Sequence, residues 1–412
     1  MKFEYFIAKR IIGSKSYKSS VSAPIIKIGI AAIAIGIIVM LIAIATGIGL
    51  QQKIRDKAVA FNGHLTISSF DSNISEESLN PISSKQEFYP NFNSVPGVSH
   101  IQVVAHKFGV IRTESDFEGM VLKGVGFDYN WSLFEEFLID GRLPEFDNGN
   151  MSSEVLIPEY LAKRLVLNTG DSFQMYFARE NIDRPPSIRK FNIVGIYRSG
   201  FLELDETYLM GDIRQIQRLN SWESDQIGHF ELFISDYDEL KEVANAVYQN
   251  TPSVLNTETV SEKYASIFEW ISIFDKNIYG IIGIMILVAG INMITALLVL
   301  ILERTQMIGI LKALGSRNWN VQRIFLINAA YLILLGLFWG NLIGIGLLVM
   351  QQNFGLFPLD PEVYYVTQAP VYLSLSYVLS LNLGTFLICL LMLMIPSMII
   401  SRISPVKAMR FE

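Results

Sequence analysis

The chain has 412 residues, of which 51% are hydrophobic and only 17% are charged. This is more apolar sequence than one water-soluble core would use, so part of the chain is expected to lie in lipid. Its net charge of −6 comes from 33 basic and 39 acidic residues, and the basic ones are unevenly distributed along the sequence. A single cysteine, Cys389, excludes an intramolecular disulfide, and the four scattered histidines predict no metal site.

The first long uncharged run covers residues 28–50 and follows a polar N-terminal segment, residues 1–27. Such a run could be a signal peptide, but the apolar core of a signal peptide is usually only 7–15 residues long. A helix of about 20 residues is enough to cross a hydrocarbon core of about 30 Å. We therefore expect a retained first span over residues 28–50.

Residues 51–276 contain short alternating stretches separated by Gly, Pro, Asn and Asp, a pattern typical of a water-soluble α+β domain. The strands expected are His64–Ile67, His100–Val104, Ser172–Phe177 and Phe191–Ile196, and the helices expected include Glu159–Leu165 and Asp236–Tyr248. Residues 51–60 and 264–276 contain no helix breaker. Both stretches are therefore expected to prolong the neighbouring spans as helical stalks.

Three further spans are expected in the C-terminal half of the chain, over residues 277–302, 324–350 and 371–395. They are joined by a loop at 303–323 and a shorter loop at 351–370, and a tail at 396–412 ends the sequence. The predicted fold class is thus membrane α-helical with four transmembrane helices. A large α+β extracytoplasmic domain is inserted between the first two.

The distribution of lysine and arginine predicts the orientation in the membrane. The N-terminal segment, the 303–323 loop and the tail carry basic residues, whereas the 351–370 loop carries Asp360 and Glu362 and no basic residue. Short loops rich in lysine and arginine remain in the cytoplasm. Both termini are therefore predicted to be cytoplasmic and residues 51–276 to lie in the periplasm.

An apolar stripe at helical spacing lies in the 303–323 loop, formed by Met307, Ile310, Leu311 and Leu314. Gly315 is suited to end this helix as a capping residue. Arg304 and Lys312 are expected to keep the helix at the water surface. By its residues alone, such a helix could dock to another protein or lie on lipid headgroups.

Several stretches along the chain resemble one family. They are Phe6–Arg10, Ile28–Ile30, Gly47–Gln51, Gly63–Leu65, Leu156–Pro158, Leu161–Ala162, Gly170–Asp171, Glu303–Arg304, Ile308–Gly315 and Ser404–Glu412. In these stretches the chain resembles the LolC/LolE-type lipoprotein-releasing permeases, which belong to the FtsX/MacB-like class of ABC transporter permeases. The resemblance covers essentially the whole sequence.

The resemblance implies a role for the 303–323 loop, because in family members this loop transmits nucleotide-driven closure of an ATPase subunit to the spans. The residues expected to couple to the ATPase are Glu303, Arg304, Met307, Ile308, Gly309, Ile310, Leu311, Lys312, Leu314 and Gly315. A substitution there should uncouple ATP hydrolysis from transport without removing substrate binding.

A second candidate site is the loop at residues 178–190, between two predicted strands. On composition alone it is a solvated hairpin loop. In lipoprotein-releasing permeases a hairpin at the corresponding place binds a soluble periplasmic carrier. The candidate carrier-binding residues here are Arg184, Pro185, Pro186 and Arg189.

A third candidate is a substrate cavity along the first two spans. Adaptable apolar side chains suit acyl chains, and those present are Met40, Ile44, Ile48, Met285 and Met293. Residues that simply face lipid would look the same. Asn292 and Asn328 also lie within spans, and each is expected to hydrogen-bond a neighbouring helix.

Enzyme motifs are not found in the sequence. It has no phosphate-binding Gly-x-x-x-x-Gly-Lys-Ser/Thr loop, and Gly13-Ser14-Lys15-Ser16 lacks the first glycine and the Gly-Lys pair. The chain is therefore expected to bind no cofactor and to be no enzyme, with ATP and Mg held by a partner. The expected partners are two ATPase subunits, a second permease subunit, identical or homologous, a lipoprotein substrate, a periplasmic lipoprotein carrier and membrane phospholipid, with no nucleic acid.

The function expected from the resemblance is extraction of lipoproteins from the outer leaflet of a bacterial inner membrane. Two alternatives remain open from the sequence. One is a MacB-like efflux or mechanotransmission permease, whose substrate need never enter the membrane. The other is an FtsX-like regulator of a cell-wall hydrolase.

Overall fold

The computed structural model describes residues 3–13, 23–70, 77–113, 116–146, 150–179 and 185–403. The chain divides into two compact units. We call them the helical unit, residues 1–51, 270–358 and 368–412, and the sheet unit, residues 52–269 and 359–367.

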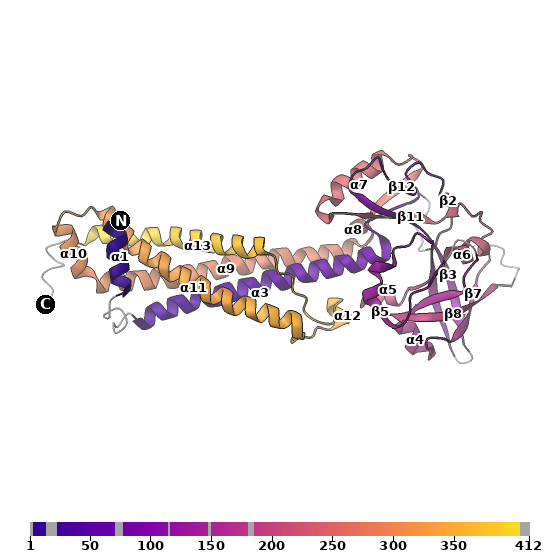
Figure 1. Ribbon diagram of the computed structural model, residues 1–412, viewed down its shortest axis with the longest axis horizontal. Helices are drawn as coiled ribbons and strands as arrows, with labels where there is room; N and C mark the ends of the chain where they lie inside the picture. The colour runs from indigo at the N-terminus through magenta and orange to yellow at the C-terminus, as the bar shows by residue number, and fades with distance from the viewer. Residues whose placement is uncertain are drawn as a thin grey trace. The chain divides into compact units, whose positions relative to one another are not determined.

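Four long helices dominate the helical unit and run side by side (Figure 1): α3 (Ala23–Asn62), α9 (Ala265–Glu303), α11 (Asn318–Phe354) and α13 (Leu375–Ser397). Among the described residues, these four are long and apolar enough to cross a membrane. Neither α3 nor α9 is interrupted at the predicted stalks, since α3 continues to Asn62 and α9 already begins at Ala265. The shorter helices are α1 (Phe3–Gly13), α10 (Thr305–Ala313) and α14 (Ile399–Arg402).

A glycine stripe on α11 lets two long helices approach closely. Gly336, Gly340 and Gly344 follow one another at four-residue spacing, so they share one face of the helix. A Cβ at Gly336 would lie 2.7 Å from the Ile33 side chain of α3, and a Cβ at Gly340 would lie 2.8 Å from Ile37. Small residues at this spacing bring helix backbones into contact in membranes. The four-residue spacing of these glycines is visible in the sequence itself.

Asparagines within the spans behave in three different ways. Asn341 and Asn382 exchange side-chain hydrogen bonds of 2.6 and 2.9 Å, which join α11 to α13. Asn292 was predicted to bond a neighbouring helix, but its amide donates to the Val288 carbonyl of its own helix at 2.9 Å. This prediction is wrong, because the carbonyl one turn earlier is the nearer acceptor. Asn328 is fully buried, and neither of its side-chain polar atoms has a partner among the described residues.

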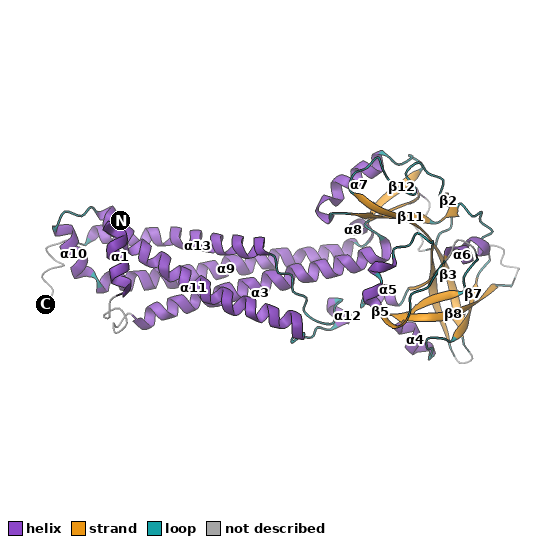
Figure 2. Cartoon of the chain, in the orientation of Figure 1, coloured by secondary structure: helices purple, strands orange, loops and turns teal. Residues whose placement is uncertain are grey.

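The sheet unit is built on ten paired strands in the order β12-β1-β11-β3-β4-β9-β6-β8-β5, with β7 pairing β3 and β8. Figure 2 shows strands of this unit, among them β3, β7 and β8, with the helices α4 and α6 beside them. Most pairs are antiparallel, and β4–β9 and β6–β8 are parallel. The strands are β1 (Leu65–Ser69), β3 (Val98–Arg112), β4 (Phe117–Val125), β5 (Leu138–Gly141), β6 (Glu154–Pro158), β7 (Ser172–Phe177), β8 (Ser187–Tyr197), β9 (Tyr208–Asp212), β11 (His229–Ile234) and β12 (Leu255–Thr259). A separate two-stranded ribbon pairs β2 (Ile82–Ser83) with β10 (Gln226–Ile227).

Buried and exposed residues alternate along several strands of the sheet unit, and the buried ones belong to its core. On β7, Phe173, Met175 and Phe177 are buried while the residues between them are more exposed, as the two-residue period of a strand requires. The helices are α4 (Glu159–Leu165), α5 (Leu202–Asp205), α6 (Ile213–Leu219), α7 (Leu240–Gln249), α8 (Val260–Lys263) and α12 (Pro361–Tyr364), and single 3-10 turns cover Trp131–Leu133, Glu135–Phe137 and Tyr237–Glu239. Each predicted strand and helix of this domain has a counterpart, but the helix predicted over Asp236–Tyr248 begins only at Leu240, after a 3-10 turn at Tyr237–Glu239, and the strand predicted from His64 begins at Leu65.

Candidate functional site

The apolar stripe expected on α10 is divided between two faces. Ile308 and Leu311 are 0% and 9% exposed and belong to the core of the helical unit. Ile310 and Leu314 are 47% and 79% exposed. A helix turns about 100° per residue, so positions 308 and 311 share one face and positions 310 and 314 another. The expectation that Leu311 lies on the docking stripe is therefore corrected, because this side chain packs inward.

The end of α10 has the geometry predicted from its glycine. Gly315 has a φ of +90°, a left-handed conformation that glycine adopts without steric cost. The Ser316 amide donates to the Leu311 carbonyl at 3.0 Å, which closes the helix in a Schellman-type turn. The chain can therefore turn sharply from α10 into α11.

Lys312 was expected to hold α10 at the water surface, but in the structure its side chain donates hydrogen bonds to backbone carbonyls. Its Nζ donates to the carbonyls of Ile400 at 2.5 Å and Ile403 at 2.9 Å, at the end of α14. Burial lowers the pKa of Lys312. A cation is favourable at a helix C-terminus, where the carbonyls lack helical partners. Lys312 thus joins α10 to the last turn that follows the fourth span.

The exposed face of α10 is mixed in character. It is formed by Gln306, Ile310, Ala313 and Leu314, and Glu303 at the end of α9 is also exposed. Met307 and Arg304 are partly buried beside it, and Gly309 lies within the buried face. Two exposed aliphatic side chains flanked by polar ones suit a protein contact better than the buried face does, because that face is already occupied. We call this set the α10 face.

A buried ion pair anchors the last turn of α3 in the sheet unit. Lys123 of β4 and Glu231 of β11 are 1% and 0% exposed, and their side chains are 2.5 Å apart. Lys123 also donates to the Phe61 carbonyl in the last turn of α3, and the Gln102 amide donates to Glu231 at 2.8 Å. Burial alone would raise the pKa of Glu231, but the Lys123 ammonium and the nearby His229 together outweigh it and hold this pKa below its usual range. The helix end and the sheet therefore share one charged centre.

The loop between the third and fourth spans is fastened to the sheet unit. Tyr365 stacks on Phe201 with ring centroids 4.5 Å apart, and its carbonyl accepts a 2.7 Å hydrogen bond from Lys57 of α3. Burial lowers the pKa of Lys57 to about 8. Tyr365 has a φ of +59°, which costs a non-glycine residue roughly 1–3 kcal/mol. We call this attachment the Tyr365 strap.

The predicted carrier-binding hairpin joins β7 to β8, but its loop is shorter than expected. Arg189 pairs with Met175 inside the ladder, so it is a strand residue, and this part of the prediction is corrected. Pro185 and Pro186 lie in the loop and are exposed, whereas Arg184 is outside the described residues. Alternating pairing with β7 extends β8 back to residue 187.

Basic side chains gather beside this hairpin. Burial and the nearby guanidinium groups of Arg218 and Arg179 lower the pKa of Arg189. A cavity of about 660 Å³ at the same strands is lined by Arg112, Thr113, Leu167, Ser172, Phe173, Gln174, Tyr176 and Lys190. The hairpin and this cavity form a basic surface, which favours an acidic partner.

The residues expected to line a substrate cavity are placed at different depths. Met40 and Met293 are 0% and 1% exposed and pack inside the helical unit, so they present no free surface to an acyl chain in this arrangement. Ile44 and Met285 are partly buried against the same core, and Ile48 is partly buried. In the described part of the chain, no three His, Cys, Asp or Glu side chains are grouped as a metal ion would require.

Two known protein families match this chain, over successive parts of the sequence. Residues 28–262 match the family of MacB-like periplasmic core domains, and residues 279–405 match the FtsX-like permease C-terminal family. The chain belongs to the MacB/FtsX-like family of ABC transporter permeases. The permease is therefore a membrane component and not an enzyme by itself. Its apolar helices and periplasmic core domain fit an inner-membrane protein.

Relatives match this permease over nearly its whole length. The lipoprotein-releasing system transmembrane protein LolC of Xylella fastidiosa is 22% identical over 99% of this chain and 97% of its own. LolE of Haemophilus influenzae is 21% identical over 99% of both chains. The crystal structure of the periplasmic region of MacB from Actinobacillus actinomycetemcomitans is 15% identical, with a TM-score of 0.32, over 49% of this chain and 91% of that one. The resemblance to LolC/LolE-type permeases is confirmed.

Proposed function

We propose that this permease extracts lipoproteins from the outer leaflet of the inner membrane and passes them to a periplasmic carrier, driven by ATP hydrolysis in a partner subunit. The observation that carries the proposal is the extent of the similarity to LolC, which covers 99% of this chain and includes both units. If this chain and LolC shared only one domain, the similarity would cover only one of the two units. In this proposal ATP and Mg are bound by the partner, and the permease transmits force.

The proposed assembly contains two ATPase subunits and a second permease subunit. Both termini and α10 are cytoplasmic, and the sheet unit is periplasmic, which the basic residues near α10 support. A single chain already fills its own bundle with Met40 and Met293. The lipoprotein would therefore enter between two permease subunits, and a partly buried residue such as Ile44 or Met285 is better placed to reach it.

The proposed contact with the ATPase is the α10 face. Ile310 and Leu314 are its exposed aliphatic residues, and α10 is tied through Lys312 to the end of α14. Movement of the ATPase would then reach both the second and the fourth spans. On the periplasmic side, the proposed contact for the carrier is formed by the exposed residues Pro185 and Pro186 and the basic residues beside them.

The test is ATP-dependent release of a radiolabelled triacylated lipoprotein from spheroplasts that express the permease with its cognate ATPase. Leu314→Asp is expected to reduce release about tenfold or more, because it places a charge in an apolar contact. Val254→Asp is the matched control, since Val254 is 73% exposed and belongs to the sheet unit rather than to α10. Its release should equal that of the unmodified chain.

The opposite result has a clear meaning. Strong ATP hydrolysis with no lipoprotein release in the presence of the carrier would contradict the proposal and favour a MacB-like mechanotransmission function. Unchanged release by Leu314→Asp would leave lipoprotein extraction intact but remove the α10 face as the ATPase contact.

A further inference from the structure

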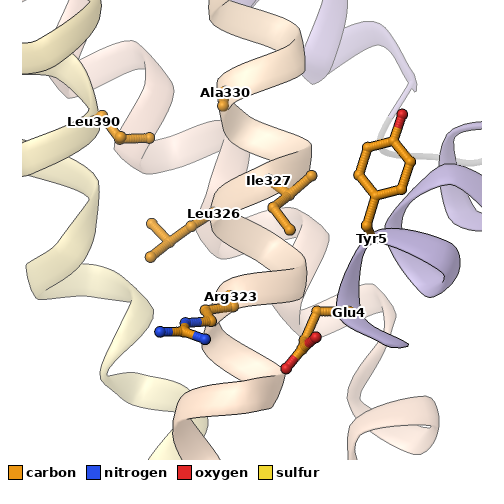
Figure 3. A pocket seen from close by; sticks show the side chains of 7 residues that line it. All are labelled: Glu4, Tyr5, Arg323, Leu326, Ile327, Ala330 and Leu390. Atoms are coloured by element: carbon orange, nitrogen blue, oxygen red, sulfur yellow. The ribbon is translucent and has the colours of Figure 1, made fainter. Parts of the chain in front are cut away.

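A groove of about 400 Å³ lies where the N-terminal helix meets the bundle. It is lined by Glu4, Tyr5, Arg323, Leu326, Ile327, Ala330 and Leu390, which come from α1, α11 and α13 (Figure 3). All these elements belong to the helical unit. None of the residues discussed above for coupling, carrier binding or substrate lines this groove.

The groove has a charged end and an apolar body. Arg323 is separated from Leu326, Ile327 and Ala330 by three, four and seven positions, so these residues form one face of α11. At about 1.5 Å per residue, this face extends for roughly 10 Å along the helix. Glu4 and Arg323 are the charged lining residues, and Figure 3 shows both charged groups at the same end of the view.

The charged end lies where a span leaves the membrane. Arg323 is in the second turn of α11, and the 27 residues that follow, 324–350, contain no charge. Its guanidinium lies 5.2 Å from the centre of the Trp319 ring. Arginine and tryptophan side chains both have an apolar body and a polar end, which suits the membrane interface. Tyr5 and Phe6 of α1 are 51% and 47% exposed, while Ala8 is fully buried in the bundle core. Helix α1 therefore has the character of an interfacial helix packed against a span.

Among the described residues, neither Glu4 nor Arg323 forms an ion pair with another side chain. One cation and one anion at the end of an apolar groove are complementary to a molecule that carries a phosphate, an ammonium group and an acyl chain. The Glu4 carboxylate would repel a headgroup with a net negative charge. A quaternary ammonium group has no N–H to donate to the Glu4 carboxylate, whereas a primary ammonium has three.

We propose that this groove binds one phosphatidylethanolamine molecule. Arg323 holds the phosphate, Glu4 accepts a hydrogen bond from the ammonium group, and an acyl chain lies along Leu326, Ile327 and Ala330. The lipid fills the space between α1 and the spans, in the leaflet at this end of the bundle. The site is independent of lipoprotein release and requires only that the permease spans a membrane.

The test is native mass spectrometry of the full-length permease, exchanged into detergent that contains phosphatidylethanolamine, phosphatidylcholine or phosphatidylglycerol with identical acyl chains. The expected result is one retained phosphatidylethanolamine, surviving delipidation at about tenfold lower lipid concentration than the other two. Arg323→Gln should remove this retention, because charge-assisted bonds to a phosphate are strong. Glu4→Gln should remove only the preference over phosphatidylcholine. Arg317→Gln, at the start of α11 but outside the groove, should change nothing.

A steric variant tests the apolar body without touching the charges. Ala330→Phe should expel the lipid while leaving the unfolding temperature of the permease within a few degrees of the unmodified protein. Equal retention of the three lipids, or retention unchanged in Arg323→Gln and Ala330→Phe, would overturn the proposal and indicate ordinary annular lipid. Displacement of the lipid by millimolar inorganic phosphate would also overturn it, since the site would then recognise a free anion.

Discussion

Asn328 is the residue at which burial and polarity conflict most sharply. Its amide is fully buried in α11 and has no hydrogen-bond partner within the described chain. A buried polar group without a partner costs about 1–3 kcal/mol. Asn341, only thirteen positions further along the same helix, avoids that cost because Asn382 returns its hydrogen bond.

We therefore expect Asn328→Leu to raise the thermal unfolding temperature of the purified permease by several degrees. Leucine has a similar size and loses no hydrogen bond at this position. Asn341→Leu is the matched variant and should lower the unfolding temperature, because it leaves Asn382 without its partner. A decrease with Asn328→Leu would contradict this expectation and show that the unpartnered amide is not the dominant cost at this position.

His64 makes the sheet unit sensitive to acid. Burial, with a smaller effect of Arg55, lowers its pKa to about 4, and its Nδ1 accepts a hydrogen bond from the Ile234 amide at 3.3 Å. The unfolded chain therefore binds a proton at higher pH than the folded one. The stabilising contribution of neutral His64 is fully present above about pH 6.5 and is lost as the pH falls toward 4.

The expected result is that the unfolding temperature, followed by circular dichroism, falls between pH 6.5 and 4 less steeply in His64→Asn than in the unmodified protein. Asparagine can accept the same amide hydrogen bond but does not titrate. Identical slopes in the two proteins would exclude His64 as a source of the acid sensitivity.

At the scale of elements, the end of α3 depends on strands that lie far from it in sequence. Lys123 is 62 positions from Phe61 and 108 positions from Glu231, and it contacts both. A buried ion pair is worth little when compared with apolar residues, but removing one partner leaves an uncompensated charge. The pair therefore fixes where the helix enters the sheet more than it adds stability.

We expect Lys123→Met to destabilise the sheet unit by about 3–5 kcal/mol, since Glu231 would remain buried without its counter-charge. The double substitution Lys123→Met with Glu231→Leu should recover most of this loss. Urea unfolding followed by circular dichroism measures both. A double variant as unstable as the single one would show that the bond to the Phe61 carbonyl, rather than the charge, is the essential contact.

At the scale of the whole molecule, the sheet unit is made of two segments of the chain, residues 52–269 and 359–367. The first segment is continuous with the helices α3 and α9, and the second lies between α11 and α13 and is held by the Tyr365 strap. Motion of any span adjoining these segments can therefore reach the sheet unit. This arrangement is compatible with the force transmission that the proposed function requires.

Tyr365→Ala should release the strap. Loss of the Phe201 stack, an aromatic contact worth about 0.5–1.5 kcal/mol beyond its buried area, should speed hydrogen exchange in residues 359–367 up to about tenfold. Tyr364→Ala is the matched control, because Tyr364 is 37% exposed beside it. Exchange that is equally fast in both variants would contradict a specific role for Tyr365.

The features that the sequence alone determined are local ones. Four apolar runs predicted four long helices, two-residue alternation predicted strands such as Ser172–Phe177, and Gly315 predicted the end of α10. Each of these depends on residues within a few positions of one another. Hydrophobic periodicity and glycine chemistry are sufficient to reveal them.

The tertiary structure alone decided which face of α10 is buried, that Lys312 joins it to α14, and that Tyr365 belongs to the sheet unit. Lys57 and Tyr365 are separated by 308 positions, and Lys312 and Ile400 by 88. The sequence of a short helix does not show which of its apolar residues are buried, because that depends on the element that packs against it. Such contacts depend on how distant elements pack, and a single sequence carries no pattern that pairs them.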